Sequence, residues 1–270
     1  MIPPVPTLDP RERDAVARFL RAMLDAGDPP LLRAVLFGSK ARGDFDEDSD
    51  IDVLVVCDVP PSHRDRATAA VYRLADHVSA LTGVDLEPWT VCAADLQEGC
   101  RTPMLVDALE DGIPLWPSSP LRLPFTPADA CFCASCLLDW VAEGGPIVRA
   151  ALASGRLADA ARRARDDITR LATAALLLEG DTRHRRATSL LRFRQRFLLP
   201  RILSPRLLRP IAWAYDAFPS NGGRGVEHPP VTPAAIVSAE LGYQLARVME
   251  AGTVPWILRR IEALSSQRSW

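Results

Sequence analysis

The chain has 270 residues, 48% of them hydrophobic and 24% charged, with a formal net charge of -2. These proportions are typical of a soluble globular protein and exclude a disordered chain. No run approaches the roughly 18 apolar residues of a membrane span, and the N-terminus lacks the pattern of a secretory signal. We therefore expect no membrane association, and six cysteines held as reduced thiols in the cytoplasm.

The first half of the chain alternates between helical and strand patterns. Asp9 and Pro10 can open a helix, which an apolar stripe continues until the glycine and prolines at 27–30 end it. Short apolar runs rich in β-branched residues then predict strands. The predicted strands cover 31–37, 51–57, 83–91 and 113–116, and helices are predicted over 10–26, 62–82 and 93–111.

A proline-rich segment, PSSPLRLPFTP (117–127), separates this half from an Ala-, Leu- and Arg-rich half. We therefore predict domains at 1–118 and 119–270. The second is expected to be helical, with breaks at Gly144-Gly145-Pro146, at Gly180 and over 219–230. The predicted fold class is α+β, with strands and helices in the first domain and an all-α helical bundle in the second.

The most informative stretch is LFGSKARGDFDEDSDIDVLVV (36–56), which joins two predicted strands. Because side chains alternate along a strand, Asp50 and Asp52 point to the same face. Two close carboxylates repel each other unless a cation lies between them, and Mg²⁺ prefers carboxylate oxygens together with substrate phosphates. A lone D-x-D pattern before an ordinary strand is common, but here it follows a Gly-Ser turn at fixed spacing.

The Gly-Ser turn adds groups that suit a phosphate. Gly38 lets the backbone approach a phosphate closely, and Ser39 offers a hydroxyl and a backbone N–H. Lys40, the only lysine of the chain, and Arg42 stand beside the turn. Both are expected to be exposed loop cations that either steady a triphosphate or are simply solvated.

These residues resemble a known superfamily. Gly38-Ser39, Ala41-Arg42-Gly43 and Ser49-Asp50-Ile51-Asp52, followed by an apolar strand, resemble the DNA polymerase β-like nucleotidyltransferases, and most of all the minimal and aminoglycoside nucleotidyltransferases. The resemblance covers about residues 10–118. It implies a small mixed β-sheet flanked by helices. It further implies transfer of a nucleoside monophosphate from a nucleoside triphosphate, with ATP favoured, to a hydroxyl, with release of pyrophosphate. It also implies that Gly38 and Ser39 hold the triphosphate, while Asp50 and Asp52 hold two Mg²⁺ ions.

The superfamily also needs a third carboxylate, which completes the metal site or takes the proton of the accepting hydroxyl. The third predicted strand offers Asp85 and Glu87, which share a face. Asp85 resembles the residue of the minimal enzymes and is the candidate metal ligand, and Glu87 resembles that of the glutamate-using aminoglycoside enzymes. Pro88 should disturb strand pairing and indicates an edge strand or a bulge, with Asp85 in the undisturbed part. The sequence leaves both carboxylates as candidates.

The second half resembles the HEPN-type helical domains that accompany minimal nucleotidyltransferases, largely in pattern. From Arg156 to Arg209 it holds 14 arginines against five acidic residues. One explanation of this excess is a GC-rich coding bias, which favours arginine, together with ordinary solvated helix faces. The alternative is a basic surface that faces a nucleotide or another polyanion.

Three functions compete on this basis. The first is a nucleotidyltransferase whose acceptor is a small molecule such as an aminoglycoside. The second modifies a protein or an RNA in a toxin–antitoxin setting. The third is a nucleotide-binding module without catalysis. The acceptor, the nucleotide preference and a homodimeric state are left open by the sequence.

Overall fold

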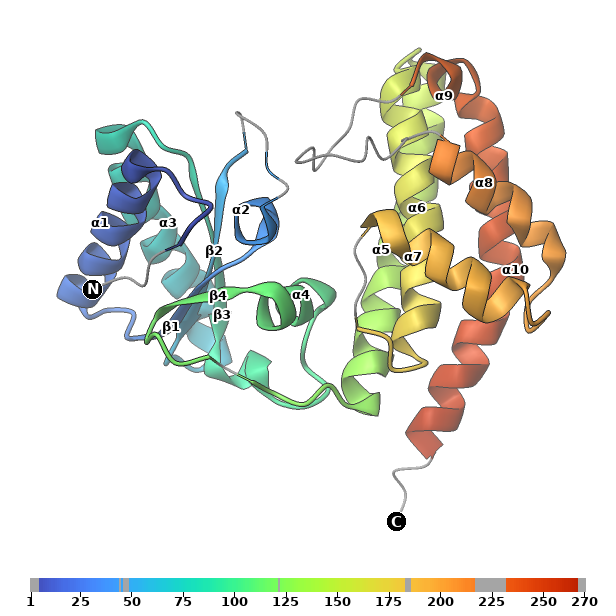
Figure 1. Cartoon of the computed structure of the whole chain (residues 1–270). Coiled ribbons are helices and arrows are strands. Elements are labelled where there is room, and N and C mark those ends of the chain that lie inside the picture. Colours follow the sequence, from blue (N-terminus) through green and yellow to red (C-terminus); the bar gives the residue numbers. More distant parts are fainter. Residues whose placement is uncertain are drawn as a thin grey trace. The chain divides into compact units, whose positions relative to one another are not determined.

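The computed structural model describes residues 5–43, 45, 49–120, 122–182, 186–216 and 232–266 (Figure 1). The chain divides into two compact units, the first running to Pro124 and the second beginning at Phe125. The predicted boundary at 118–119 falls shortly before this point, and the independence of the two halves stays a prediction. The predicted break at 219–230 lies outside the described residues.

The first unit combines a mixed sheet with helices, and the predicted α+β class is confirmed. Its strands are β1 (Leu31–Leu36), β2 (Ile51–Cys57), β3 (Leu86–Cys92) and β4 (Ile113–Trp116). Its helices are α1 (Pro10–Ala26), the short α2 (Gly38–Arg42), α3 (Arg64–Thr82) and α4 (Pro103–Asp111), with 3₁₀ turns η1 (Pro61–His63) and η2 (Ala93–Leu96).

The helix α1 begins where the sequence predicts. Asp9 accepts a hydrogen bond from the Glu12 backbone, and the Glu12 side chain accepts one from the Asp9 backbone, which forms a capping box. Gly27, with φ of 66°, ends the helix in the left-handed conformation. Val16 and Phe19 lie fully buried on the face that α1 turns toward the sheet.

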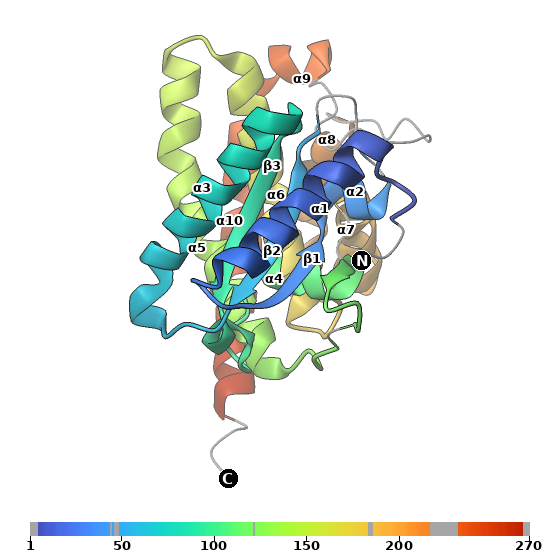
Figure 2. The same cartoon turned by 90° about the vertical axis from the view of Figure 1, so that its left-hand side faces the viewer.

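Four described strands form one sheet in the order β3-β2-β1-β4. β1 is antiparallel to β2 and to β4, while β2 and β3 are parallel. The helices α1 and α3 cover one face (Figure 2), and residues of α4 pack on the other. β3 is an edge strand, as Pro88 indicates. The expectation that Pro88 disturbs the strand pairing is wrong, because the register of β3 against β2 is unbroken and the proline stands at the edge of the sheet.

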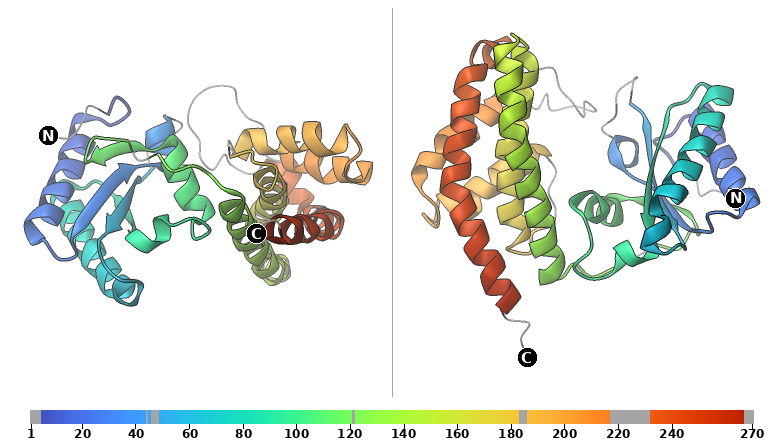
Figure 3. Two further views of the ribbon diagram at one scale, coloured as in Figure 1. Left: turned by 90° about the horizontal axis from the view of Figure 1, so that it is seen from below. Right: turned by 180° about the vertical axis from the view of Figure 1, so that it is seen from behind.

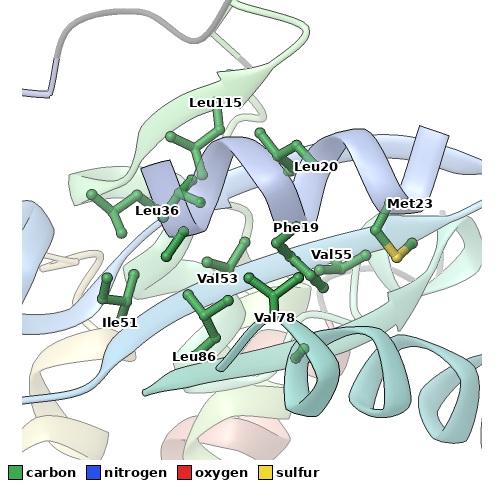
Figure 4. Packing of buried hydrophobic residues seen from close by; sticks show 14 of the residues in the cluster. Phe19, Leu20, Met23, Leu36, Ile51, Val53, Val55, Val78, Leu86 and Leu115 are labelled. Carbon is green, nitrogen blue, oxygen red and sulfur yellow. The ribbon is translucent and has the colours of Figure 1, made fainter. Parts of the chain in front are cut away.

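The core of this unit follows from the alternation of β2. Ile51, Val53 and Val55 pack with residues of α1 and α3 (Figure 4), whereas Leu54 and Val56 pack with residues of α4. Both faces of β2 are apolar and buried, so its register is fixed by the close packing of these side chains against the helices on each side. The position of Asp52, the polar residue at the start of this strand, is therefore well defined.

The second unit is helical, as predicted. Its helices are α5 (Pro127–Ala153), α6 (Leu157–Leu177), α7 (Arg186–Phe193), α8 (Leu208–Asp216), α9 (Pro233–Val237) and α10 (Ala239–Ser266), with a π-helical turn at Arg194–Leu198 and a 3₁₀ turn at Pro205–Leu207. The three long helices α5, α6 and α10 pack against one another (Figure 3). The similarity of this unit to HEPN domains stays a prediction.

The predicted break at Gly144-Gly145-Pro146 is wrong, because α5 runs through it. A Cβ at Gly144 would lie 2.3 Å from Oδ2 of Asp167 on α6, so the glycine lets a buried carboxylate approach the α5 backbone. Local propensity disfavours glycine and proline inside a helix by about 1 and 3 kcal/mol, and the packing of α5 offsets this cost. The predicted break at Gly180 is confirmed just after α6.

By length and composition, α5 would also pass for a membrane span. From the sequence we expect no segment long and apolar enough to span a membrane, and α5 differs from that expectation. A core helix of a helical bundle, however, meets the same criteria of length and hydropathy. α5 packs against α6 and α10, and its window of highest hydropathy is partly buried among them.

The five acidic residues that lie between Arg156 and Arg209 are all ion-paired. Each of the five lies within 4 Å of at least one arginine. The pairs are Arg156–Asp159, Arg165–Asp166, Arg163 and Arg170 with Asp167, Arg196 and Arg260 with Glu179, and Arg192–Asp181. Part of the arginine excess therefore serves the packing of the bundle, and polyanion binding stays a prediction.

The buried Asp167 carboxylate makes this unit sensitive to pH. Burial raises its pKa to about 6, and the charges of Arg163 and Arg170 oppose this only in part. Because the folded-state pKa lies above the ordinary value of 3.8, the stabilisation from the neutral acid is present below that value and is lost as the pH rises through about 6.

We therefore expect the free energy of unfolding of Asp167→Asn, relative to the wild type, to rise by about 2 kcal/mol between about pH 4 and pH 7. Urea unfolding followed by circular dichroism at both pH values measures this difference. Asp159→Asn, at an exposed ion pair of the same helix, is the control. A difference between Asp167→Asn and the wild type that stays constant with pH would contradict the assignment.

Candidate active site

The Gly-Ser turn is packed directly against Asp52. β1 ends at Leu36, and α2 begins at Gly38, whose φ of 72° is in the left-handed region. A Cβ at Gly38 would lie 1.9 Å from Oδ2 of Asp52, so the Asp52 carboxylate rests on the bare Gly38 backbone. The backbone N–H of Phe37 donates to the carbonyl oxygen of Asp52 at 3.1 Å, which ties the turn to the start of β2.

We expect Gly38→Ala to disable this site. The methyl group needs the space of the Asp52 carboxylate, and a left-handed φ costs a residue with a Cβ about 1–2 kcal/mol. Turnover should fall by at least about 10-fold, while thermal unfolding shifts by only a few degrees. Gly27→Ala is the matched control: its φ is equally left-handed, but a Cβ there meets no atom within 4 Å. Equal turnover of the two variants would contradict a role for the Gly38–Asp52 contact.

The parallel pairing of β2 and β3 places Glu87 beside Asp52. The two residues are register partners, and neighbouring strands lie about 4.8 Å apart. Partners in a parallel ladder point to the same face, so Asp52 and Glu87, both half-buried, stand side by side on one face of the sheet.

Asp50 and Asp85 occupy the corresponding positions just before each strand. The backbone N–H of Ile51 donates to the carbonyl oxygen of Asp85 at 3.0 Å, which continues the ladder by one step. Asp85 is exposed and precedes β3, so the expectation that it lies within the strand is wrong. Asp50 is half-buried.

Ser39 is completely buried at the start of α2. Its hydroxyl has no hydrogen-bond partner among the described residues. Buried hydroxyl groups are nearly always paired, so an unpaired one beside a conformationally special glycine marks a functional candidate. Because the Oγ atom is enclosed, a phosphate would reach it only after a local rearrangement, and the predicted triphosphate contact stays a prediction.

Lys40 is not the exposed loop cation expected from the sequence. Its side chain is 5% exposed, and its Nζ atom lies 2.6 Å from Oε1 of Glu12 on α1. The ammonium also lies 4.1 Å from the centre of the Phe45 ring. Lys40 therefore links α2 to the capped end of α1. Arg42 is half-buried at the end of α2.

The donor atoms at the start of β2 fit a magnesium–nucleotide complex. In the described part of the chain, no three His, Cys, Asp or Glu side chains gather closely enough to hold a metal ion. Mg²⁺, however, is usually held by one or two carboxylates together with substrate phosphates rather than by a cage of protein ligands. Asp50 and Asp52, beside the Gly-Ser turn, offer carboxylate oxygens of that kind.

The fold and the site together define a class of protein. A Gly-Ser turn, paired aspartates at the start of the next strand and a small mixed sheet covered by helices are the features that the sequence motif predicted. Residues 16–91 match the family model described as a nucleotidyltransferase domain, and this stretch contains the Gly-Ser turn, both aspartates and Glu87. The chain therefore carries a nucleotidyltransferase domain of the polymerase β-like type.

Two proteins of Methanocaldococcus jannaschii are similar to part of the chain, and both bear protein adenylyltransferase as a provisional name. One is 44% identical over 48 residues, which cover 18% of this chain and 48% of the relative. The other is 50% identical over 34 residues, or 13% of this chain and 34% of the relative. The chain thus spans about half or less of the length of these curated relatives.

Proposed function

We propose that this protein is a Mg²⁺-dependent nucleotidyltransferase. It transfers a nucleoside monophosphate from a nucleoside triphosphate, ATP in the first place, to a hydroxyl group of a small molecule. The observation that carries the proposal is the packing of the Asp52 carboxylate on Gly38, with Glu87 as its partner across the ladder. The Gly-Ser turn thus lies against one carboxylate of β2, and a second carboxylate stands beside it on β3.

Each residue then has a distinct task. Asp50 and Asp52 would hold Mg²⁺, which when bound neutralises charge on the triphosphate and on the leaving pyrophosphate. The Gly38 backbone would lie against the phosphates, with the Ser39 amide as a further donor. No contact with the triphosphate is assigned to Lys40, because its ammonium is held by Glu12.

The reaction is an in-line substitution at the α-phosphorus. The acceptor oxygen forms a bond to phosphorus, and the bond from phosphorus to the bridging oxygen of pyrophosphate breaks. The proton of the acceptor hydroxyl passes to a carboxylate of the protein. We assign this step to Glu87 rather than Asp85, because Glu87 is half-buried beside Asp52 whereas Asp85 is exposed ahead of the strand.

A protein hydroxyl is the second candidate acceptor. The provisional names of the two relatives favour it, but the matches cover only 48 and 34 residues. An aminoglycoside remains the first candidate, on the motif resemblance. An RNA acceptor, a non-catalytic nucleotide-binding role, a homodimer and the cytoplasmic location stay open alternatives.

The test combines a nucleotide screen with an acceptor screen. The full chain and Mg²⁺ are incubated with each of the four ribonucleoside triphosphates and with either a panel of aminoglycosides or purified protein acceptors, including the chain itself. We expect pyrophosphate release that depends on an aminoglycoside, with a gain in acceptor mass equal to one nucleoside monophosphate. A mass gain on a protein alone would show that the acceptor is a protein hydroxyl and not an aminoglycoside. Absence of release with every pair would overturn both.

A further inference from the structure

A tyrosine hydroxyl holds one oxygen of the Glu87 carboxylate. Tyr72 lies on α3, and its hydroxyl donates a hydrogen bond to Oε1 of Glu87 at 3.0 Å. Both side chains are half-buried, and α3 packs against β3. The bond therefore connects a helix that covers the sheet to the edge strand that carries the carboxylate.

We propose that Tyr72 is a positioning residue for Glu87, a role that rests on the proposed nucleotidyl transfer. A glutamate side chain has three rotatable bonds, and on an edge strand it has neighbours on one side only, so it populates several rotamers. The Tyr72 hydroxyl selects among them by occupying Oε1. Glu87 leaves its strand on the face that it shares with Asp52, whereas Tyr72 comes from α3 on the other face, so the bond fixes Oε1 at the edge of the sheet. Oε2 is the atom that we assign to the proton of the acceptor hydroxyl.

The chemistry of a phenol suits this task. A lysine or arginine partner would neutralise the carboxylate, whereas a neutral hydroxyl orients it and leaves its charge in place. Burial, then the hydrogen bond to Glu87 and its negative charge, raise the pKa of Tyr72, so the hydroxyl keeps its proton and remains a donor at neutral pH. The exposed Asp76, one turn further along α3, acts in the same direction.

A double-mutant cycle on the full chain separates positioning from a structural role. The variants are Tyr72→Phe, Glu87→Gln and the two combined, with pyrophosphate release as the measure of turnover. We expect Tyr72→Phe to lower kcat by about 10-fold with the KM for ATP within about 2-fold, and Glu87→Gln to lower kcat by about 10²-fold. In the Glu87→Gln background, Tyr72→Phe should cause no further loss, because the group that it positions is gone.

A second readout does not depend on turnover. Binding of Mn²⁺ with a non-hydrolysable ATP analogue, measured by titration calorimetry, should be unchanged in Tyr72→Phe, because Glu87 is assigned to the proton and not to the metal. Tyr215→Phe removes the same hydroxyl at an exposed tyrosine of the second unit and is the control. Thermal unfolding of every variant establishes that it is folded.

The outcomes distinguish a failure of the positioning role of Tyr72 from a failure of the proposed nucleotidyl transfer. Additive losses in the cycle, normal turnover of Tyr72→Phe, or weakened Mn²⁺–nucleotide binding would overturn the positioning role while wild-type transfer still stands. Normal turnover of Glu87→Gln would overturn it as well, because Tyr72 would then have no reacting group to position. A wild type without pyrophosphate release would overturn the proposed function, and this inference with it.

Discussion

The Asp52→Asn variant is expected to lose nucleotidyl transfer by roughly 10³-fold, with the fold intact. A bound metal ion contributes several kcal/mol to such a reaction, and each 1.36 kcal/mol is a tenfold change in rate. An amide has the shape of the carboxylate but lacks its charge, so it fills the same space beside Gly38 and holds Mg²⁺ poorly. The backbone carbonyl of Asp52, which accepts from Phe37, is unchanged.

Pyrophosphate release at saturating ATP and Mg²⁺ measures this loss, and Asp50→Asn should behave alike. Asp58→Asn is the matched control, because Asp58 is an exposed aspartate that directly follows the far end of β2. It should retain near-normal turnover. An active Asp52→Asn variant would show that the paired aspartates do not hold the metal.

The Glu12→Gln variant is expected to lose about 3 kcal/mol of unfolding free energy. Lys40 would be left with a buried charge and no carboxylate partner, and this is more costly than the loss of the attraction alone. Glutamine keeps an oxygen that can accept from the Asp9 backbone, so the cap of α1 survives. Replacing both partners, as in Glu12→Gln with Lys40→Met, should recover most of the loss.

Urea unfolding followed by circular dichroism gives these free energies. Asp14→Asn, which removes an exposed ion pair with Arg18 on the same helix, should cost less than about 0.5 kcal/mol. If Glu12→Gln were as mild as Asp14→Asn, the Lys40–Glu12 pair would not hold α2 against α1.

Much of the nucleotidyltransferase domain could be predicted because its signals are local. The cap at Asp9 and the apolar strands arise from residues close together in the chain, and the prediction that Asp50 and Asp52 share a face rests on the same kind of signal. The Gly-Ser turn belongs to the same short segment. The helical second unit followed from periodicity in the same way, although the predicted break at Gly144-Gly145-Pro146 was wrong, because α5 runs through it.

Contacts between distant residues could not be predicted in this way. The glycines of α5 look like a break until Asp167 of α6 is seen against Gly144 and Arg247 of α10 against Gly145. Lys40 looks like a solvated cation until Glu12, 28 positions away, is seen beside it. A single sequence contains each residue of such a pair but no sign that the two will meet.

The sequence by itself therefore determined the α+β class, the positions of the strands along the chain and the motif of the candidate site, because each depends on neighbours along the chain. Only the tertiary structure decided that Glu87 and not Asp85 lies beside Asp52, and that Tyr72 holds Glu87. Both depend on the register of β2 against β3 and on the packing of α3. That register is set by apolar faces buried from several elements at once, which no local pattern specifies.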